Sequence, residues 1–197
     1  MASPLHYLDD AETLAAERAA FLEAAFELVE QAQSIDLQVA QVVRQAGRHN
    51  AAFYRIFGSK EGLVLAVVEE AVRRAVVVVE RRMQSAQTPR DAVRAWARAL
   101  LGLAAGSSVT VPAIALDRFR LLRRFPHADA TIADPLREVL RRVLPATRNP
   151  SPALLAEAAF ELVLGRQASW IALGHRPTDR EIRAYADLVA RLVGLPD

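Results

Sequence analysis

The stretch from Gln45 to Leu63, QAGRHNAAFYRIFGSKEGL, constrains the fold of this chain more than any other. An apolar helical pattern precedes Ala46-Gly47, and a glycine there can take the positive φ that ends a helix and begins a tight turn. A short second helix with a polar, basic start then follows. Its small side chains suit insertion into the DNA major groove, where base edges are read from the start of such a helix. The stretch therefore predicts a DNA-binding helix-turn-helix.

The end of this stretch predicts a second helix boundary. Gly58 would stop the short helix, and Ser59 is the expected N-cap of the next one. Lys60, the only lysine in the chain, would then lie in the first turn. The free N–H groups of that turn attract an anion such as a DNA phosphate.

These residues resemble a known family pattern, A-G-x-x-x-x-x-F-Y-x-x-F-x-S-K-E-x-L. The matching positions are Ala46, Gly47, Phe53, Tyr54, Phe57, Ser59, Lys60, Glu61 and Leu63. The pattern resembles that of the TetR family of bacterial transcriptional repressors, and the resemblance covers about the first 85 residues directly. Arg48 stands where the family usually has a small apolar residue, and Ala51 where it usually has glycine. The resemblance implies a homodimer that binds a palindromic operator and responds to a ligand.

The helix-turn-helix prediction assigns two roles to its polar residues. We expect base edges to be approached by His49 and Asn50, and by Arg48 if its side chain is exposed. We expect phosphate contacts from Arg44, Tyr54 and Lys60, although Tyr54 could instead anchor the helix.

Composition bounds the rest of the chain. Its 197 residues, 52% of them apolar, can bury a substantial core in one large or two small domains. No apolar run approaches the ~20 residues of a membrane span, and the first ten residues lack the pattern of a signal peptide. Cysteine is absent, so disulfides and thiolate sites are excluded. We expect a soluble cytoplasmic protein with no cofactor or metal.

Charge is unevenly distributed. Residues 37 to 60 hold four basic residues and no acidic one: Arg44, Arg48, Arg55 and Lys60. Residues 9 to 36 hold eight acidic residues against one arginine. Over residues 1 to 85, 9 basic and 12 acidic side chains give a net charge of −3, so this part is not broadly basic. DNA binding would then depend on a local patch, present in two copies.

Apolar residues recur at three- and four-residue intervals, which predicts an all-α fold. We expect helices at about 10–33, 37–45, 48–55, 60–83, 90–105, 110–124, 132–144, 151–173 and 178–193. Asp36 is the expected cap of the second helix. The four valines from Val76 to Val79 could form a strand, but their charged flanks favour one long helix. We assign residues 1–58 to the DNA-binding domain and 59–197 to a sensor and dimerisation domain, joined by a long helix at 59–84.

Each of the last two expected helices has small or apolar residues along one face, and such faces suit self-association. The expected interface residues are Ala158, Leu162, Gly165, Ser169, Ala172, Ile182, Tyr185, Val189 and Leu192. Small side chains let a second helix approach closely, and two such helices per subunit would form a four-helix interface. The residues alone fit equally well with stripes that close the core of a monomer, and the family resemblance favours the dimer.

The opposite face of the eighth helix predicts a sensor cavity. The expected lining residues are Trp96, Leu100, Leu103, Ile114, Phe119, Phe160, Leu164, Gln167 and Ile171. For any one of them, taken individually, a filled core is the favoured interpretation. Gln167 is distinctive because a buried amide needs a hydrogen-bonding partner, which can be protein, water or ligand. The expected ligand is a small apolar or amphipathic molecule.

Catalysis finds no support in the motifs. The four histidines are scattered without metal-ligand spacing, and Gly58-Ser59-Lys60 lacks the upstream glycine of a phosphate-binding loop because Phe53 occupies its place. We expect a ligand-responsive transcriptional regulator and not an enzyme. The alternative is a helical small-molecule-binding or protein-interaction dimer with weak or lost DNA binding.

Overall fold

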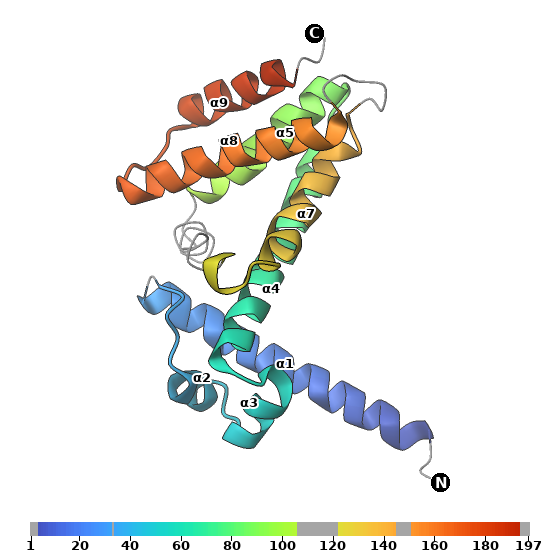
Figure 1. The fold of residues 1–197 in the computed structure, drawn as a ribbon, viewed down its shortest axis with the longest axis vertical. Coiled ribbons are helices and arrows are strands. Elements are labelled where there is room, and N and C mark those ends of the chain that lie inside the picture. Colours follow the sequence, from blue (N-terminus) through green and yellow to red (C-terminus); the bar gives the residue numbers. More distant parts are fainter. Residues whose placement is uncertain (1–3, 33, 106–121, 145–150, 194–197) are drawn as a thin grey trace. The chain divides into compact units, whose positions relative to one another are not determined.

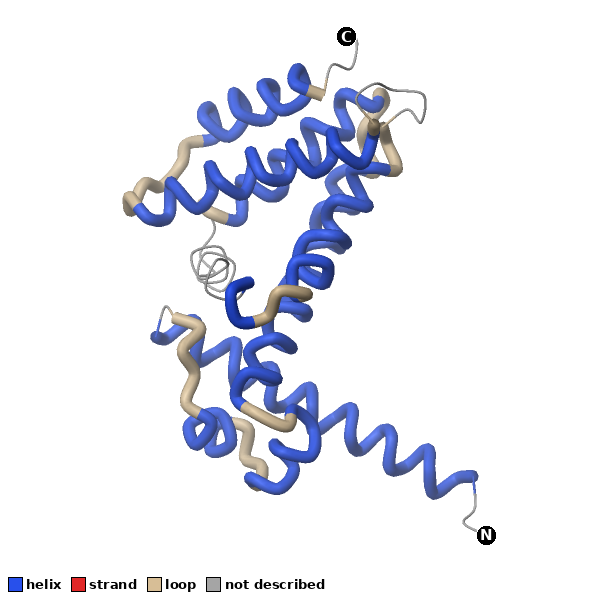
Figure 2. The backbone as a smooth tube through the Cα atoms, viewed as in Figure 1, coloured by secondary structure: helices blue, strands red, loops and turns tan. Residues whose placement is uncertain are grey.

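The protein is described by a computed structural model that covers residues 4–32, 34–105, 122–144 and 151–193. Every regular element within these residues is a helix (Figure 2), which confirms the predicted all-α fold. The helices are α1 (Pro4–Ala32), α2 (Val39–Gln45), α3 (Asn50–Phe57), α4 (Lys60–Met83), α5 (Pro89–Leu103), α7 (Ala128–Arg141), α8 (Pro152–Ala172) and α9 (Asp179–Leu192) (Figure 1). The helix expected at 110–124 falls mostly outside the described residues. None of the described helices is long and apolar enough to cross a membrane.

The chain forms two compact units, unit 1 (Met1–Val68) and unit 2 (Glu69–Asp197). Helix α4 runs through the boundary between them as one continuous element, and it includes Val76 to Val79. Val79 is fully buried within α4, while Val77 is 49% exposed. Residues two positions apart lie on the same face of a strand but not of a helix, so the different burial of Val77 and Val79 agrees with a helix.

Unit 1 contains α1, α2 and α3 and the start of α4. Its core is formed by α1 residues such as Phe21 and Val29, which pack with Val42 of α2 and Phe53 of α3, all of them fully buried. Burial of these side chains supplies the main favourable free energy of a unit of this size.

Three helix starts in unit 1 differ from the sequence-based expectation, and the first is that of α1, which begins at Pro4 instead of about residue 10. Helix α2 begins at Val39 after the extended residue Gln38, so Asp36 does not cap it. Helix α3 begins at Asn50, because His49 has an extended backbone with φ −104° and ψ 150° and serves as its N-cap. The chain is held in the turn before it by the Arg48 N–H, which donates to the Val43 carbonyl at 3.2 Å.

Unit 2 is built from α5, α7, α8 and α9 together with the second part of α4. Two of its helix starts are capped by threonine. Thr88 accepts a hydrogen bond from the Asp91 N–H at the start of α5, and Thr178 forms a reciprocal capping box with Glu181 at the start of α9. Such caps replace the missing intrahelical partners of the first N–H groups.

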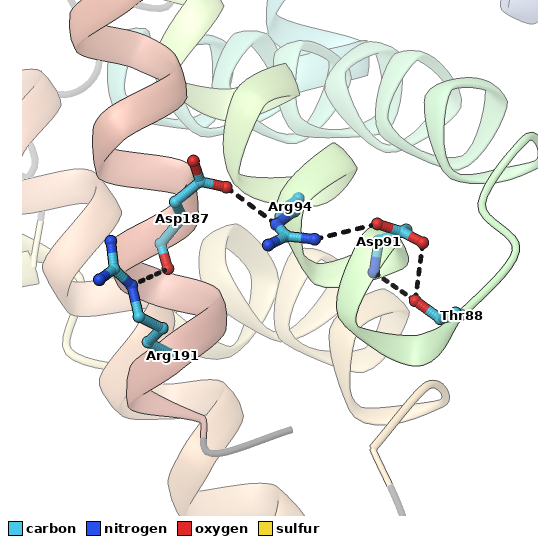
Figure 3. A network of polar contacts seen from close by, with 5 residues as sticks. All are labelled: Thr88, Asp91, Arg94, Asp187 and Arg191. Carbon is cyan, nitrogen blue, oxygen red and sulfur yellow. Dashed lines mark hydrogen bonds and ion pairs between the residues drawn. The ribbon is translucent and has the colours of Figure 1, made fainter. Parts of the chain in front are cut away.

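A polar network ties α9 to α5 (Figure 3). Arg94 of α5 donates from Nε to Asp187 of α9 at 2.8 Å and from Nη1 to Asp91 at 3.1 Å. Asp91 also accepts from the Thr88 hydroxyl at 2.7 Å, and this bond, with that of Arg94, lowers the pKa of the Asp91 carboxyl. The network thus bridges two helices that lie far apart in the sequence.

Candidate nucleic-acid interface

Aromatic residues anchor α3 to the interior of unit 1. The Phe21 ring of α1 lies edge-on to the Phe53 and Phe57 rings, with centroids 5.7 and 5.8 Å apart. Edge-to-face pairs at this spacing are favourable beyond the area they bury. Because Ala52 and Phe53 are buried, Asn50, Ala51 and Tyr54 are turned to the surface. One face of α3 is therefore fixed to α1 while the other faces outward.

Both turns around α3 use glycine in the left-handed backbone region. Gly47 has φ 60° after α2, and Gly58 has φ 70° as the C-cap of α3. Glycine takes this conformation without the steric cost that a Cβ would add. The two positions identified from the sequence as helix ends are confirmed.

The junction between α3 and α4 depends on a third glycine that the sequence reasoning did not single out. A Cβ at Gly62 would lie 2.0 Å from the Phe57 carbonyl oxygen, which is far inside van der Waals contact. The Gly62 N–H in turn donates to the Ser59 hydroxyl at 3.0 Å, so Ser59 caps α4 as expected. The close approach of the two helix ends is a tertiary contact, and no local sequence signal reveals it.

The expected DNA-contacting residues lie on exposed parts of unit 1. Arg44, Arg48, His49 and Asn50 are exposed, at the end of α2, in the turn and at the start of α3. Tyr54 is 53% exposed, and its ring stacks edge-on against Phe53 at 5.2 Å. Tyr54 thus combines an outward surface with an anchoring contact.

Two of the four basic residues of this region are paired with acidic residues of unit 1. Lys60 Nζ lies 2.6 Å from Asp36 Oδ1, and the Arg55 guanidinium of α3 forms an ion pair with Glu17 of α1. Arg44 and Arg48 make no ion pair within the part of the chain that the structure describes. The free positive charge of this surface is therefore concentrated around the turn between α2 and α3.

The expected sensor residues of unit 2 mostly have protein partners. Gln167 is 3% exposed, and its Nε2 donates to the Leu100 carbonyl in the last turn of α5 at 2.9 Å. Trp96 is fully buried and donates from Nε1 to the Leu136 carbonyl at 3.0 Å. Phe160 is buried, and Leu103, Leu164 and Ile171 are half-buried. Ile114 and Phe119 lie outside the described residues.

Two pockets in the described part of unit 2 lie elsewhere. One of about 490 Å³ lies between α7 and α8, where charged residues such as Asp134, Arg137 and Glu157 line it. The other, of about 300 Å³, adjoins the Arg94 network of Figure 3. Neither is lined by the residues expected to form the sensor cavity. The described residues include no group of three or more histidines and carboxylates placed to hold a metal.

The expected interface residues of α8 and α9 fall into two groups. Ala158, Gly165, Ala172 and Leu192 are exposed, and Leu162, Ser169 and Tyr185 are half-buried. Ile182 and Val189 are only 8% and 1% exposed within unit 2. The single chain already packs these last two residues in its core, and their assignment to a subunit interface stays a prediction.

Comparison with known proteins agrees with this geometry. Residues 21–67 match the family described as "Bacterial regulatory proteins, tetR family". No curated protein matches the chain. Among solved structures, a TetR transcriptional regulator from Rhodococcus sp. RHA1 is 22% identical with a TM-score of 0.70, covering 91% of this chain and 96% of that one.

Two ligand-bound structures also share the fold. RolR in complex with resorcinol is 17% identical with a TM-score of 0.69, and 94% of this chain and 91% of that chain are covered. FadR from Bacillus subtilis in complex with stearoyl-CoA is 17% identical with a TM-score of 0.67, and 89% and 96% are covered. Residues 21–67 of this chain therefore match the family of tetR bacterial regulatory proteins, and the chain as a whole has the helical fold of the solved regulators.

Proposed function

We propose that this chain represses transcription by binding a specific DNA operator in the bacterial cytoplasm, and that a small-molecule effector releases it. The observation that carries the proposal is the outward face of α3. Its polar start is exposed while Phe53 and Phe57 hold its other face against α1. Such an anchored helix with exposed polar residues at its N-terminal end is suited to reading base edges in the major groove.

Within this proposal the exposed residues take two roles. His49, Asn50 and Arg48 approach base edges, while Arg44, Tyr54 and Lys60 contact phosphates. Base contacts carry sequence information, and phosphate contacts contribute affinity that depends on salt and not on sequence. Residues 1–58 form the DNA-binding domain, and 59–197 form the sensor and dimerisation domain.

A pair of substitutions tests these roles. Asn50→Ala should reduce discrimination between operator and unrelated DNA by ~1–3 kcal/mol, because it removes a base contact. Lys60→Ala should weaken binding to both DNAs similarly and lower the salt slope by about one unit. Mobility-shift titrations over a range of salt, with DNA from upstream of the protein's own gene, measure both quantities. Equal loss of specificity in the two variants would contradict the assignment.

The alternative function is a helical dimer that binds small molecules or proteins and whose DNA binding is weak or lost. The ion pairs of Arg55 and Lys60 favour it, because they reduce the positive charge available to DNA. Absence of sequence-specific binding at low salt by an intact dimer would select this alternative.

We propose a homodimer that uses the exposed face of α8 and α9. Besides the small residues of α8, the exposed residues in these helices and at the C-cap of α8 include Leu173, Leu188 and Leu192, which are 78%, 41% and 61% exposed. Large apolar side chains at this degree of exposure favour burial against a partner. A dimer with twofold symmetry would bind a palindromic operator through two recognition helices about 34 Å apart.

Replacing Gly165 with leucine should break the dimer and leave the subunit folded. A Cβ at Gly165 meets nothing within 4 Å in the single chain, so the added side chain projects into free space. Overpacking of the subunit interface by ~1–3 kcal/mol would raise the dimer dissociation constant about five- to 150-fold. Analytical ultracentrifugation measures this constant.

Ala153→Leu is the matched control, because Ala153 is an exposed small residue on a different face of α8. It should leave the dimer unchanged. An unaltered dimer in Gly165→Leu would place the interface elsewhere.

The proposed effector is an apolar or amphipathic molecule bound among the helices of unit 2. The bound molecules of RolR and FadR, resorcinol and stearoyl-CoA, support this class of ligand. Helix α4 is proposed to transmit the effect of ligand binding to the DNA-binding helices, since it continues from one unit into the other. An effector that releases DNA must itself be bound more weakly, by the same factor, when DNA is present. Calorimetric titration with and without operator DNA tests this reciprocity.

A further inference from the structure

Two cations of the candidate DNA-binding surface are held by acidic residues from distant parts of unit 1. Lys60 lies in the first turn of α4, and its Nζ is 2.6 Å from Asp36 in the segment between α1 and α2. Arg55 lies in the last turn of α3 and pairs with Glu17 of α1. Each pair joins residues at least 24 positions apart in the chain, so neither is a contact between neighbouring residues on one helix.

Both pairs remain accessible to an external anion. The side chains of Lys60 and Asp36 are 36% and 69% exposed, and that of Arg55 is 59% exposed. An ion pair in such contact with water is weak, so its cation can exchange a carboxylate for another anion at small cost. A DNA phosphate is a strong competitor because each contact releases counterions condensed on the duplex.

We propose that Asp36 and Glu17 act as internal competitors of DNA phosphates, holding Lys60 and Arg55 in the free protein and lowering its affinity for DNA. The inference rests on the proposed DNA binding and adds a device that limits its strength. It gives a role to Glu17 of α1 and Asp36 of the following segment. Without such a role, these negative charges would only repel DNA. Arg44 and Arg48, without such partners in the described residues, then supply the first attraction to DNA.

The charge-neutralising substitution Asp36→Asn tests the first pair. It should tighten binding to a duplex of arbitrary sequence at low salt by about two- to fivefold, since the cost of breaking an exposed ion pair no longer opposes binding. Glu17→Gln should have an effect of similar size through Arg55. Fluorescence anisotropy with a labelled duplex of about 30 base pairs measures these affinities. Circular dichroism confirms that the variants remain folded.

The matched control is Glu12→Gln, which removes one negative charge from an exposed position on the same helix as Glu17. It reports the general effect of lowering the negative charge near DNA. The effects of Asp36→Asn and Glu17→Gln should exceed it. In the Lys60→Ala background Asp36→Asn should do no more than Glu12→Gln, because the cation for which Asp36 competes is gone.

The outcomes separate this inference from the proposed function. Specific operator binding by the wild type, with Asp36→Asn and Glu12→Gln equal in effect, would overturn the competition and leave the function standing. Tightening by Asp36→Asn that depends on Lys60, on DNA bound without sequence preference, would support the competition and reject the sequence-specific function. An equal gain from Asp36→Asn with and without Lys60 would also overturn the competition. If no variant binds DNA at any salt concentration, both are rejected.

Discussion

Replacing Phe53 with alanine is expected to lower the free energy of unfolding of unit 1 by ~3–5 kcal/mol. Phe53 is fully buried, and its ring contacts those of Phe21 and Phe57 with centroids 5.7 and 5.4 Å apart. Truncation would leave a cavity between α1 and α3 and remove the contacts that turn the polar start of α3 outward. A small unit has little stability in reserve, so this loss would unfold it for much of the time.

Tyr54→Ala provides the matched control for this prediction. Tyr54 is the adjacent aromatic residue on the same helix, but it is 53% exposed, so its truncation should cost less than ~1 kcal/mol. Hydrogen exchange measured by mass spectrometry should show lost protection over α1 to α3 in Phe53→Ala and retained protection in α8 and α9. Similar protection in the two variants would contradict the assignment of Phe53 as the anchor of α3. If Tyr54 also contacts phosphate, Tyr54→Ala will weaken DNA binding while the fold is kept.

The local signals of the sequence predicted much of the fold. The extent of α4, the cap at Ser59 and the turns at Gly47 and Gly58 follow from glycine, a capping hydroxyl and apolar periodicity, which all act over a few residues. The start of α2 was harder to predict from the sequence, because Asp36 is of a residue type that often caps helices. Its carboxylate instead pairs with Lys60, 24 positions further along the chain, and this contact depends on the tertiary fold.

Prediction of the candidate site succeeded in the same way where a property follows from residues close together in the sequence. The exposure of Arg44, Arg48 and Asn50 agrees with the helical pattern. The ion pairs of Arg55 and Lys60 cannot be predicted from the sequence, because the first depends on the packing of α1 against α3 and the second on the approach of the segment before α2 to the start of α4. The stripe of α9 illustrates a different limit. Periodicity places Ile182 and Val189 on the same face of α9 as Leu192, although the first two are buried and Leu192 is exposed. Periodicity cannot distinguish a face that packs on the subunit's own core from one that packs on a partner.

The hydrogen-bonding partner of the Gln167 amide could also be identified only from the structure. A buried amide must have a partner, and here the Leu100 carbonyl fills that role. Gln167 therefore joins α8 to the last turn of α5. A ligand that binds near this point would have to preserve the bond or replace it, because an unpaired buried carbonyl is costly.

The largest effect in unit 2 is expected from Trp96→Ala, at ~3–5 kcal/mol of unfolding free energy. Trp96 is fully buried in α5, and its indole N–H donates to the Leu136 carbonyl of α7 at 3.0 Å. The substitution removes the largest fully buried side chain of the described residues and the hydrogen bond together. Chemical denaturation followed by far-ultraviolet circular dichroism measures the loss.

Trp96→Phe separates packing from hydrogen bonding at the same position. It retains most of the apolar volume and loses the indole donor, so the expected cost is ~1–2 kcal/mol for the lost bond. The chain has only two tryptophans, so in Trp96→Phe the fluorescence of Trp170 alone reports the unfolding of unit 2. A loss in Trp96→Phe as large as that in Trp96→Ala would assign the stability to the bond between α5 and α7. A negligible loss would show that packing alone holds this part of the core.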